Sequence, residues 1–151
     1  MDHSKLHLPT FNIFLADDDE DDRSIFHDAI KNLFPQANYT TAENGLEMLE
    51  LLQKAPADLS DIVFLDINMP KLNGIDCLKR IKSSGTLNVL PVVMLSTSND
   101  PATIKTAFNL GALYYAVKPA TFDEIKALFH KIISQVQLKG CAPSYTDFQI
   151  G

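Results

Sequence analysis

The sequence has little cysteine, no clustered positive charge and no long hydrophobic run, and each of these features narrows the class of protein. Its two cysteines, Cys77 and Cys141, lie far apart and form no C-x-x-C motif, which indicates a reduced, cytoplasmic protein. Lys and Arg number 13 against 19 Asp and Glu, so the net charge is -6 and nucleic acid is not an expected partner. No apolar stretch approaches the ~20 residues that cross a bilayer, and the N-terminus lacks a signal-peptide pattern, so no membrane partner is expected.

The sequence does contain a regular alternation of short apolar runs and amphipathic segments, in a length that suits one domain. Hydrophobic residues make up 46% of its 151 positions, which is enough for a buried core. The apolar runs predict five strands, and apolar residues at helical spacing between and after them predict five helices. Asp100 before Pro101, and a capping box of Thr121 and Glu124, mark the starts of the last two helices. The predicted strands occupy residues 11–16, 37–42, 61–66, 90–96 and 113–117.

Strands that are continuously apolar are buried on both faces, and this favours a parallel sheet. With right-handed crossovers, the pattern predicts an α/β fold with a doubly wound, five-stranded parallel sheet. We expect residues 1–9 to form an N-terminal extension, residues 10–138 the domain, and residues 139–151 a C-terminal tail without secondary structure. Binding sites in such sheets lie at the carboxyl ends of the strands.

Charged and polar residues stand where the predicted strands end. Asp17 and Asp18 follow the first strand, Asp66 ends the third, Ser96 ends the fourth, and Lys118 follows the fifth. Parallel strands bring these ends to one edge, so three carboxylates, a hydroxyl and an ammonium should gather there. Three adjacent carboxylates need compensating charge, and Mg²⁺ with oxygen ligands would supply it. A carboxylate can then attack phosphorus in line, while the lysine neutralises phosphoryl oxygens.

Four stretches of the chain resemble the sequence marks of response-regulator receiver domains, in the order that the family has them. They are LADDDEDD, VFLDINMPKLNG, PVVMLSTS and YYAVKP, and the resemblance covers roughly residues 10–137. It implies the flavodoxin/CheY-like strand order 2-1-3-4-5, with Asp66 as the phospho-acceptor and Asp17 and Asp18 as the acidic metal pair. The other implied roles are a metal-binding backbone carbonyl at Asn68, a switch hydroxyl and aromatic at Ser96 and Tyr115, a phosphoryl-binding ammonium at Lys118, tuning of hydrolysis by Asn68 and Ser98, and a cis bond between Lys118 and Pro119.

The resemblance also implies a mechanism and partners. A histidine kinase or a phosphotransfer protein donates a phosphoryl group to Asp66 in a Mg²⁺-dependent step. Ser96 then moves toward the phosphate and Tyr115 swings inward, which changes the partner preference of a surface on the fourth helix, fifth strand and fifth helix. The stretch after the last predicted helix is too short for an output domain, so we expect a stand-alone regulator with an unknown downstream protein target. The surface around Phe108, Tyr115 and Phe122 is a candidate for a homodimer or for a partner.

Two other functions fit parts of the same pattern. A phosphatase of the haloacid-dehalogenase type would use Asp17 as nucleophile and Asp19 as acid/base. Its D-x-D-x-[TV] signature is incomplete because residue 21 is Asp, and the chain is short for that fold with a substrate cap. A binding module of the receiver fold that works without phosphorylation is the second alternative, and the intact set of acids, serine and lysine argues against it. On simpler grounds, we expect residues 19–22 to be a solvated helix start, and Tyr115 can also be interpreted as a half-buried strand aromatic.

Overall fold

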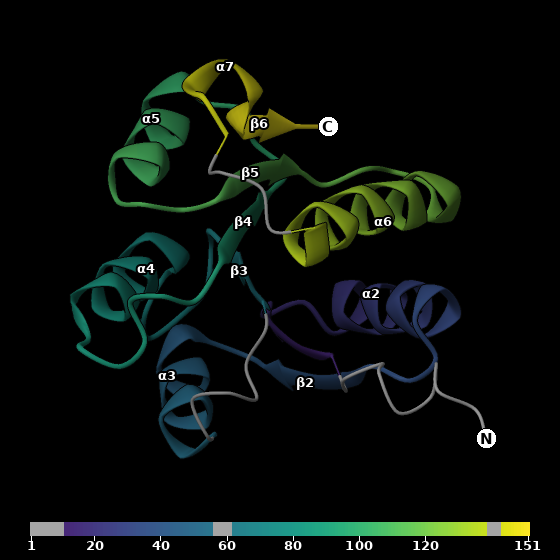
Figure 1. The fold of residues 1–151 in the computed structure, drawn as a ribbon, viewed down its shortest axis with the longest axis horizontal. Helices are drawn as coiled ribbons and strands as arrows, with labels where there is room; N and C mark the ends of the chain where they lie inside the picture. Colours follow the sequence, from purple (N-terminus) through teal and green to yellow (C-terminus); the bar gives the residue numbers. More distant parts are fainter. Residues whose placement is uncertain (1–10, 56–61, 139–142) are drawn as a thin grey trace.

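The computed structural model describes residues 11–55, 62–138 and 143–151, which form a parallel sheet between two layers of helices (Figure 1). The strands are β1 (Asn12–Ala16), β2 (Asn38–Ala42), β3 (Ile62–Asp66), β4 (Val92–Ser96), β5 (Tyr114–Val117) and β6 (Gln149–Ile150). Their order is β2-β1-β3-β4-β5-β6, and all neighbouring strands run parallel. The predicted strand order is therefore confirmed for the first five strands.

Helices cover both faces of the sheet, as the α/β prediction requires. They are α2 (Glu20–Leu33), α3 (Gly45–Lys54), α4 (Gly74–Ser83), α5 (Pro101–Asn109), α6 (Phe122–Leu138) and the short α7 (Tyr145–Phe148). One face carries α2 and α6, and the other carries α3, α4 and α5 (Figure 1). Among the described residues, no helix combines the length and the apolar character that a membrane crossing requires.

The central strands read as continuous apolar runs because both of their faces are covered. All five residues of β1, of β3 and of β4 are buried. Along β1, Ile13 and Leu15 belong to the core beneath α2 and α6, whereas Phe14 and Ala16 belong to the core beneath α3, α4 and α5. Successive side chains of one strand thus point into the two cores in turn, and their burial stabilises the three-layer arrangement.

The pairing register aligns the carboxyl ends of the central strands. Ala16 in β1 pairs with Leu65 in β3, and Ser96 in β4 pairs with Val117 in β5. Asp66 follows Leu65 as the last residue of β3. The side chains that come directly after these positions therefore share one edge of the sheet.

The predicted starts of the last two long helices are confirmed. The carboxylate of Asp100 accepts a hydrogen bond from the Thr103 backbone N–H at 3.1 Å, so it caps α5. The Thr121 hydroxyl accepts from the Glu124 backbone N–H at 3.2 Å, and a Glu124 carboxylate oxygen accepts from the Thr121 N–H at 3.3 Å. This reciprocal pair satisfies two backbone donors that the start of α6 would otherwise leave unpaired.

The C-terminal residues correct the sequence prediction, which assigned them no element. After residues 139–142, which lie outside the described part, α7 and β6 dock on the edge strand β5 and give the sheet six strands instead of five. Phe148 is fully buried and its ring lies 5.2 Å from that of Phe108, while Ile150 joins the core on the opposite face. Two apolar side chains on opposite faces are the physical reason that this segment packs. The expected extension at residues 1–9 lies outside the described residues.

Candidate functional site

Three carboxylates meet at the carboxyl edge of the sheet. Asp17 follows β1, Asp66 ends β3, and the two are almost fully buried, with 0% and 6% of their surface exposed. Asp18 is exposed beside them. Each of the three residues offers a carboxylate oxygen within 4.8 Å of the others. The structure therefore brings together the three acids that the sequence placed at the strand ends.

Burial controls the protonation of Asp66. The pKa of this carboxyl is raised from 3.8 to about 7, and removal from water is the largest cause. The positive charge of Lys118 and a hydrogen bond with the Asn68 backbone lower that pKa, whereas the charges of Asp17 and Asp18 raise it. The proximity of the three carboxylates carries an electrostatic cost that a bound cation would relieve.

Lys118 supplies the positive charge of the site. Its Nζ donates to Oδ2 of Asp17 at 2.9 Å and to Oδ2 of Asp22 at 3.0 Å, and lies 3.5 Å from Oδ1 of Asp66. Burial by itself lowers the pKa of Lys118. The hydrogen bond that it donates to Asp17, the charges of Asp66 and Asp17, and the hydrogen bond that it donates to Asp22 outweigh burial and hold the pKa above its ordinary value. The ammonium is therefore charged, although the Lys118 side chain is only 10% exposed.

The loop after β1 fixes Asp17 by hydrogen bonds on several sides. Its backbone N–H donates to the Ala42 carbonyl at 3.0 Å, and its own carbonyl accepts from Nη1 of Arg23 at 2.7 Å. Its Oδ1 accepts from the Asp19 backbone N–H at 2.9 Å. Asp19 in turn caps α2, because its Oδ1 accepts from the backbone N–H groups of Asp21 and Asp22. Asp19 is thus used as a helix cap, which weakens its interpretation as the acid/base of a phosphatase.

A hydrogen-bonded path connects β4 with β5. The buried Ser96 hydroxyl oxygen accepts from the Ser98 backbone N–H at 3.0 Å, and the hydroxyl of Tyr115 donates to the Ser98 carbonyl at 2.8 Å. Tyr115 is fully buried, so its interpretation as a half-buried strand aromatic is wrong. The core beneath α5 encloses its side chain together with Phe148 from the C-terminal segment.

Asn68 and Pro119 complete the predicted set. The Asn68 side chain is exposed, two residues after Asp66. No cis peptide bond occurs among the described residues, so the expected cis bond between Lys118 and Pro119 is a wrong prediction for this structure. The trans form of a bond before proline is favoured by about 0.5–1 kcal/mol, and only the family resemblance had pointed to the other isomer.

Two residues of the site escaped the sequence interpretation. Asp22 was expected to be solvated, but its carboxylate pairs with Lys118. The sequence does contain an indication of this pairing. A helix cap at Asp19 puts Asp22 in the first turn of α2, close to the end of β1. Gly74 was given no role from the sequence, yet a Cβ atom there would lie 2.2 Å from the Asp66 carbonyl oxygen.

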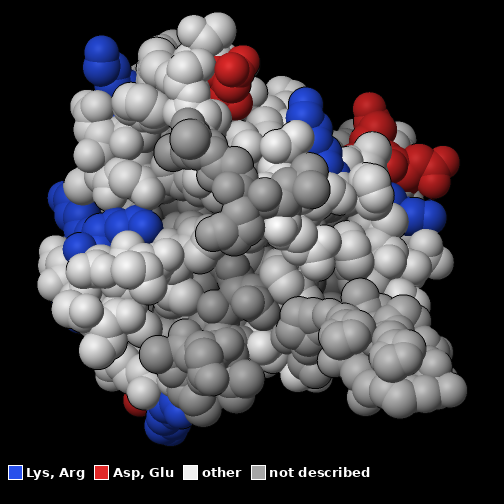
Figure 2. Space-filling model, in the orientation of Figure 1, with Lys and Arg blue, Asp and Glu red and all other residues white. Residues whose placement is uncertain are grey.

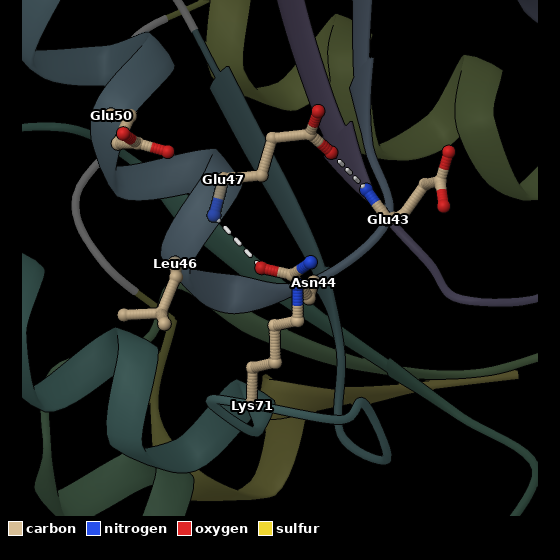
Figure 3. Close-up of a pocket in the computed structure, with 6 residues that line it drawn as sticks. All are labelled: Glu43, Asn44, Leu46, Glu47, Glu50 and Lys71. Atoms are coloured by element: carbon tan, nitrogen blue, oxygen red, sulfur yellow. Dashed lines mark hydrogen bonds between the residues drawn. The ribbon is translucent and has the colours of Figure 1, made fainter.

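Elsewhere the described surface offers shallow polar features. A hollow of about 390 Å³ lies over the start of α3 and the loop that carries Lys71, and Figure 3 draws the residues that line it. None of these residues is a predicted site residue. Its polar groups are used locally: Asn44 accepts from the Glu47 backbone N–H, and Glu47 accepts from that of Glu43 (Figure 3). On the face drawn in Figure 2, Lys and Arg lie in separate small groups and form no continuous basic patch among the described atoms.

The donor set at the strand ends suits a hard divalent cation. Asp17, Asp18 and Asp66 supply only carboxylate oxygens, and no thiol or imidazole is part of the group. Oxygen ligands of this kind, with one exposed member that leaves room for water, match the preferences of Mg²⁺ and Mn²⁺. The residues present therefore fit the metal that the sequence analysis expected.

Comparisons with known proteins agree with this geometry. The pattern of the response regulator receiver domain matches residues 13–130. Chemotaxis protein CheY1 of Helicobacter pylori is 35% identical over 109 residues, which are 70% of this chain and 86% of that protein. The structure of the phosphorylated cyanobacterial phytochrome response regulator RcpA has a TM-score of 0.79 and 28% identity, and the alignment covers 90% of this chain and 100% of that one.

A third similarity is to a chain of the CheX–CheY–BeF3–Mg complex from Borrelia burgdorferi. Its TM-score is 0.72 at 25% identity, over 86% of this chain and 93% of that one. The family match runs from β1 into α6 and includes all the strand ends that carry the acids, the serine and the lysine. The chain therefore belongs to the response regulator receiver domain family of two-component signalling.

Proposed function

We propose that Asp66 accepts a phosphoryl group from a phosphohistidine of a histidine kinase or phosphotransfer protein. The observation that carries the proposal is the position of this carboxylate. It is almost fully buried, it stands within 4.8 Å of two further acids, and it has the ammonium of Lys118 at 3.5 Å. Such a site favours charge neutralisation around an incoming phosphoryl group.

In the proposed reaction, a carboxylate oxygen of Asp66 forms a bond to phosphorus as the bond between phosphorus and the donor imidazole nitrogen breaks. The imidazole leaves with the electron pair of that bond and takes up a proton. In this proposal Lys118 neutralises a phosphoryl oxygen, and the hydroxyl of Ser96 donates a hydrogen bond to another. A Mg²⁺ ion held by Asp17, Asp18 and Asp66, with the backbone carbonyl of Asn68, would neutralise charge on the phosphoryl oxygens.

The path from Ser96 through Ser98 to Tyr115 is the proposed means of signalling. It leads from Ser96, at the carboxyl end of β4, to Tyr115 in β5. Strand β5 is part of the face that it makes with α5 and α6. When Ser96 reorients toward a phosphoryl group, the hydrogen bond from the Ser98 N–H to its oxygen must change, and Tyr115 is bonded to the same residue. The C-terminal segment already occupies part of this face, because β6 pairs with β5 and Phe148 packs on Phe108. The downstream protein target, or a second copy of the chain, is therefore expected to recognise the part around Phe122, which is exposed. Asn68 and Ser98 are both exposed, and in this proposal their side chains tune the attack of water on the phosphoaspartate.

We further propose that the protein is a stoichiometric acceptor in the cytoplasm and not a turnover phosphatase. The helix-capping role of Asp19 supports this view, because its Oδ1 is already occupied by the backbone N–H groups of Asp21 and Asp22. The domain is expected to comprise residues 10–138, with the docked C-terminal segment as an addition to it.

The experiment is phosphorylation by acetyl phosphate with Mg²⁺, followed by intact mass and by release of inorganic phosphate over time. We expect one phosphoryl adduct per chain that depends on Mg²⁺ and is absent in Asp66→Asn. The matched control is Asp123→Asn, which makes the same change at an exposed acid in the first turn of α6 and should keep the adduct. Continuous phosphate release that persists in Asp66→Asn would instead indicate a phosphatase.

A further inference from the structure

The ammonium of Lys118 is held by an acid that the phosphoryl-transfer chemistry does not require. Two of its three N–H donors are taken by Asp17 and Asp22, at 2.9 and 3.0 Å, and its distance to Oδ1 of Asp66 is longer, at 3.5 Å. Asp17 belongs to the buried acidic group, whereas Asp22 stands outside it, on helix α2. The two shortest contacts therefore pull the ammonium toward β1 and α2 and away from Asp66.

The position of Asp22 is set by the start of α2. The cap at Asp19 accepts the backbone N–H of Asp22 at 3.1 Å, which fixes that residue in the first helical turn. One turn further along, the ring of Phe26 lies 5.9 Å from Nζ of Lys118, so the same helix also covers the ammonium. The side chain of Asp22 is 35% exposed and that of Lys118 only 10%. Their contact thus has the geometry of a partly buried, charge-assisted hydrogen bond.

We propose that Asp22 is a positioning residue that anchors Lys118 away from Asp66 in the unphosphorylated protein and competes with the phosphoryl group for its ammonium. The inference rests on the proposed function of Asp66. A phosphoryl group on Asp66 brings further negative oxygens to the side of the ammonium that faces Asp66. To bond them closely, Lys118 must lengthen or give up its contact with Asp22. The Asp22 contact therefore stabilises the empty site relative to the occupied one.

The competition has a direction that can be measured. Removal of the Asp22 charge frees the ammonium to follow the phosphoryl group, so a phosphoryl analogue should bind more tightly and not less. A residue that only supported the fold would give the opposite result, or none, when it was replaced. Asp22→Asn is nearly isosteric at a partly exposed position, and Asp22→Ser removes the same charge with a smaller side chain. Agreement between the two variants shows that the charge, and not the shape, is responsible.

Asp21 offers a matched control. It is the neighbouring residue in the same helical turn, it is exposed, and its backbone N–H is likewise bound by Asp19. Asp21→Asn changes the net charge by the same amount at almost the same place, but it leaves the contact between Lys118 and Asp22 intact. Asp22→Glu retains the carboxylate on a longer arm and serves as the conservative rescue.

The experiment is titration calorimetry of beryllium fluoride, a phosphoryl analogue, at saturating Mg²⁺. We expect Asp22→Asn and Asp22→Ser to bind about three- to tenfold more tightly than wild type, since one charge-assisted hydrogen bond no longer opposes binding. Asp21→Asn should stay within about twofold of wild type, and Asp22→Glu should lie closer to wild type than to Asp22→Asn. Thermal melting of each variant confirms that it is folded.

An affinity of Asp22→Asn equal to that of Asp21→Asn, or weaker than that of wild type, would overturn the role given to Asp22. A wild-type protein that fails to bind beryllium fluoride at all would overturn the proposed function of Asp66 instead. The two failures are therefore distinguishable within one set of titrations.

Discussion

The first residue of α4 lies directly against the backbone of the acceptor candidate: a Cβ atom on Gly74 would stand 2.2 Å from the carbonyl oxygen of Asp66. The Gly74 backbone N–H also donates to the Ile67 carbonyl at 2.9 Å. Glycine therefore lets α4 begin close enough to support the end of β3. Since both contacts are to backbone, no flexible side chain can move aside to make room.

From this contact we predict that Gly74→Ala displaces Asp66 and impairs its reaction. The stability loss should be about 1–3 kcal/mol, as for overpacking of a close-packed contact. Phosphorylation by acetyl phosphate should slow by at least about tenfold, because small displacements of a reacting group are costly. Gly85→Ala is the control, since a Cβ there would meet nothing within 4 Å. Equal rates in both variants would contradict the positioning role of Gly74.

The raised pKa of Asp66 predicts a dependence of stability on pH. The folded-state pKa of about 7 exceeds the ordinary value of 3.8, so the folded protein holds the proton over that interval and the unfolded chain does not. Metal-free wild type should therefore lose stability, relative to Asp66→Asn, as the pH rises from about 4 to about 7. We expect a relative loss of about 1–3 kcal/mol, measured by urea unfolding with a chelator present. A constant difference between the two proteins across this range would contradict the prediction.

The binding of Mg²⁺ should release the proton that Asp66 holds below about pH 7. Below about pH 7, Mg²⁺ must displace the proton of Asp66, so its affinity should rise with pH until that carboxyl is ionised. The measurement is calorimetry in two buffers of different ionisation enthalpy, which counts the protons released. Asp66→Asn should bind Mg²⁺ more weakly and without this proton release. Proton release that persists in Asp66→Asn would assign the titrating group to another residue.

The docked C-terminal segment predicts a large effect for a residue far from the acceptor edge. Phe148 is fully buried in the core that also contains Tyr115, so Phe148→Ala should lower the free energy of unfolding by about 3–5 kcal/mol. Tyr145 lies on the same short helix and is 45% exposed. Tyr145→Ala should therefore have an effect of about 1 kcal/mol or less. If Phe148→Ala were as mild as Tyr145→Ala in denaturant unfolding, the segment would not be a stable part of the fold.

The sequence was sufficient for the main fold because the central strands are apolar on both faces. The strand ends could then be placed on one edge without coordinates, and Asp17, Asp66 and Lys118 followed from that placement. The small strand β6 could not be predicted in this way. It has only two residues, which are too few for a periodic pattern. It forms because β5 has unpaired backbone groups along its outer edge and because Phe148 is buried in the core.

The contacts of Asp22 and Tyr115 depend on how helices and the C-terminal segment pack, and local sequence patterns do not specify this packing. Whether Asp22 faces solvent or Lys118 depends on the exact rotation of α2 relative to β1, which the cap at Asp19 decides. The full burial of Tyr115 depends on the C-terminal segment, which the sequence pattern had left without structure. Local patterns therefore gave the residues at the strand ends, and tertiary packing gave their partners.

Reductive trapping can identify the phosphorylated residue itself. Wild-type protein treated with acetyl phosphate and Mg²⁺ is reduced with borohydride, which converts a phosphoaspartate to homoserine, and the modified residue is then located by peptide mass spectrometry. We expect homoserine at position 66 and none at positions 17 or 18, with no conversion when Mg²⁺ is omitted. Homoserine at position 17 would favour the phosphatase alternative, and no conversion at any aspartate would contradict the acceptor role of Asp66.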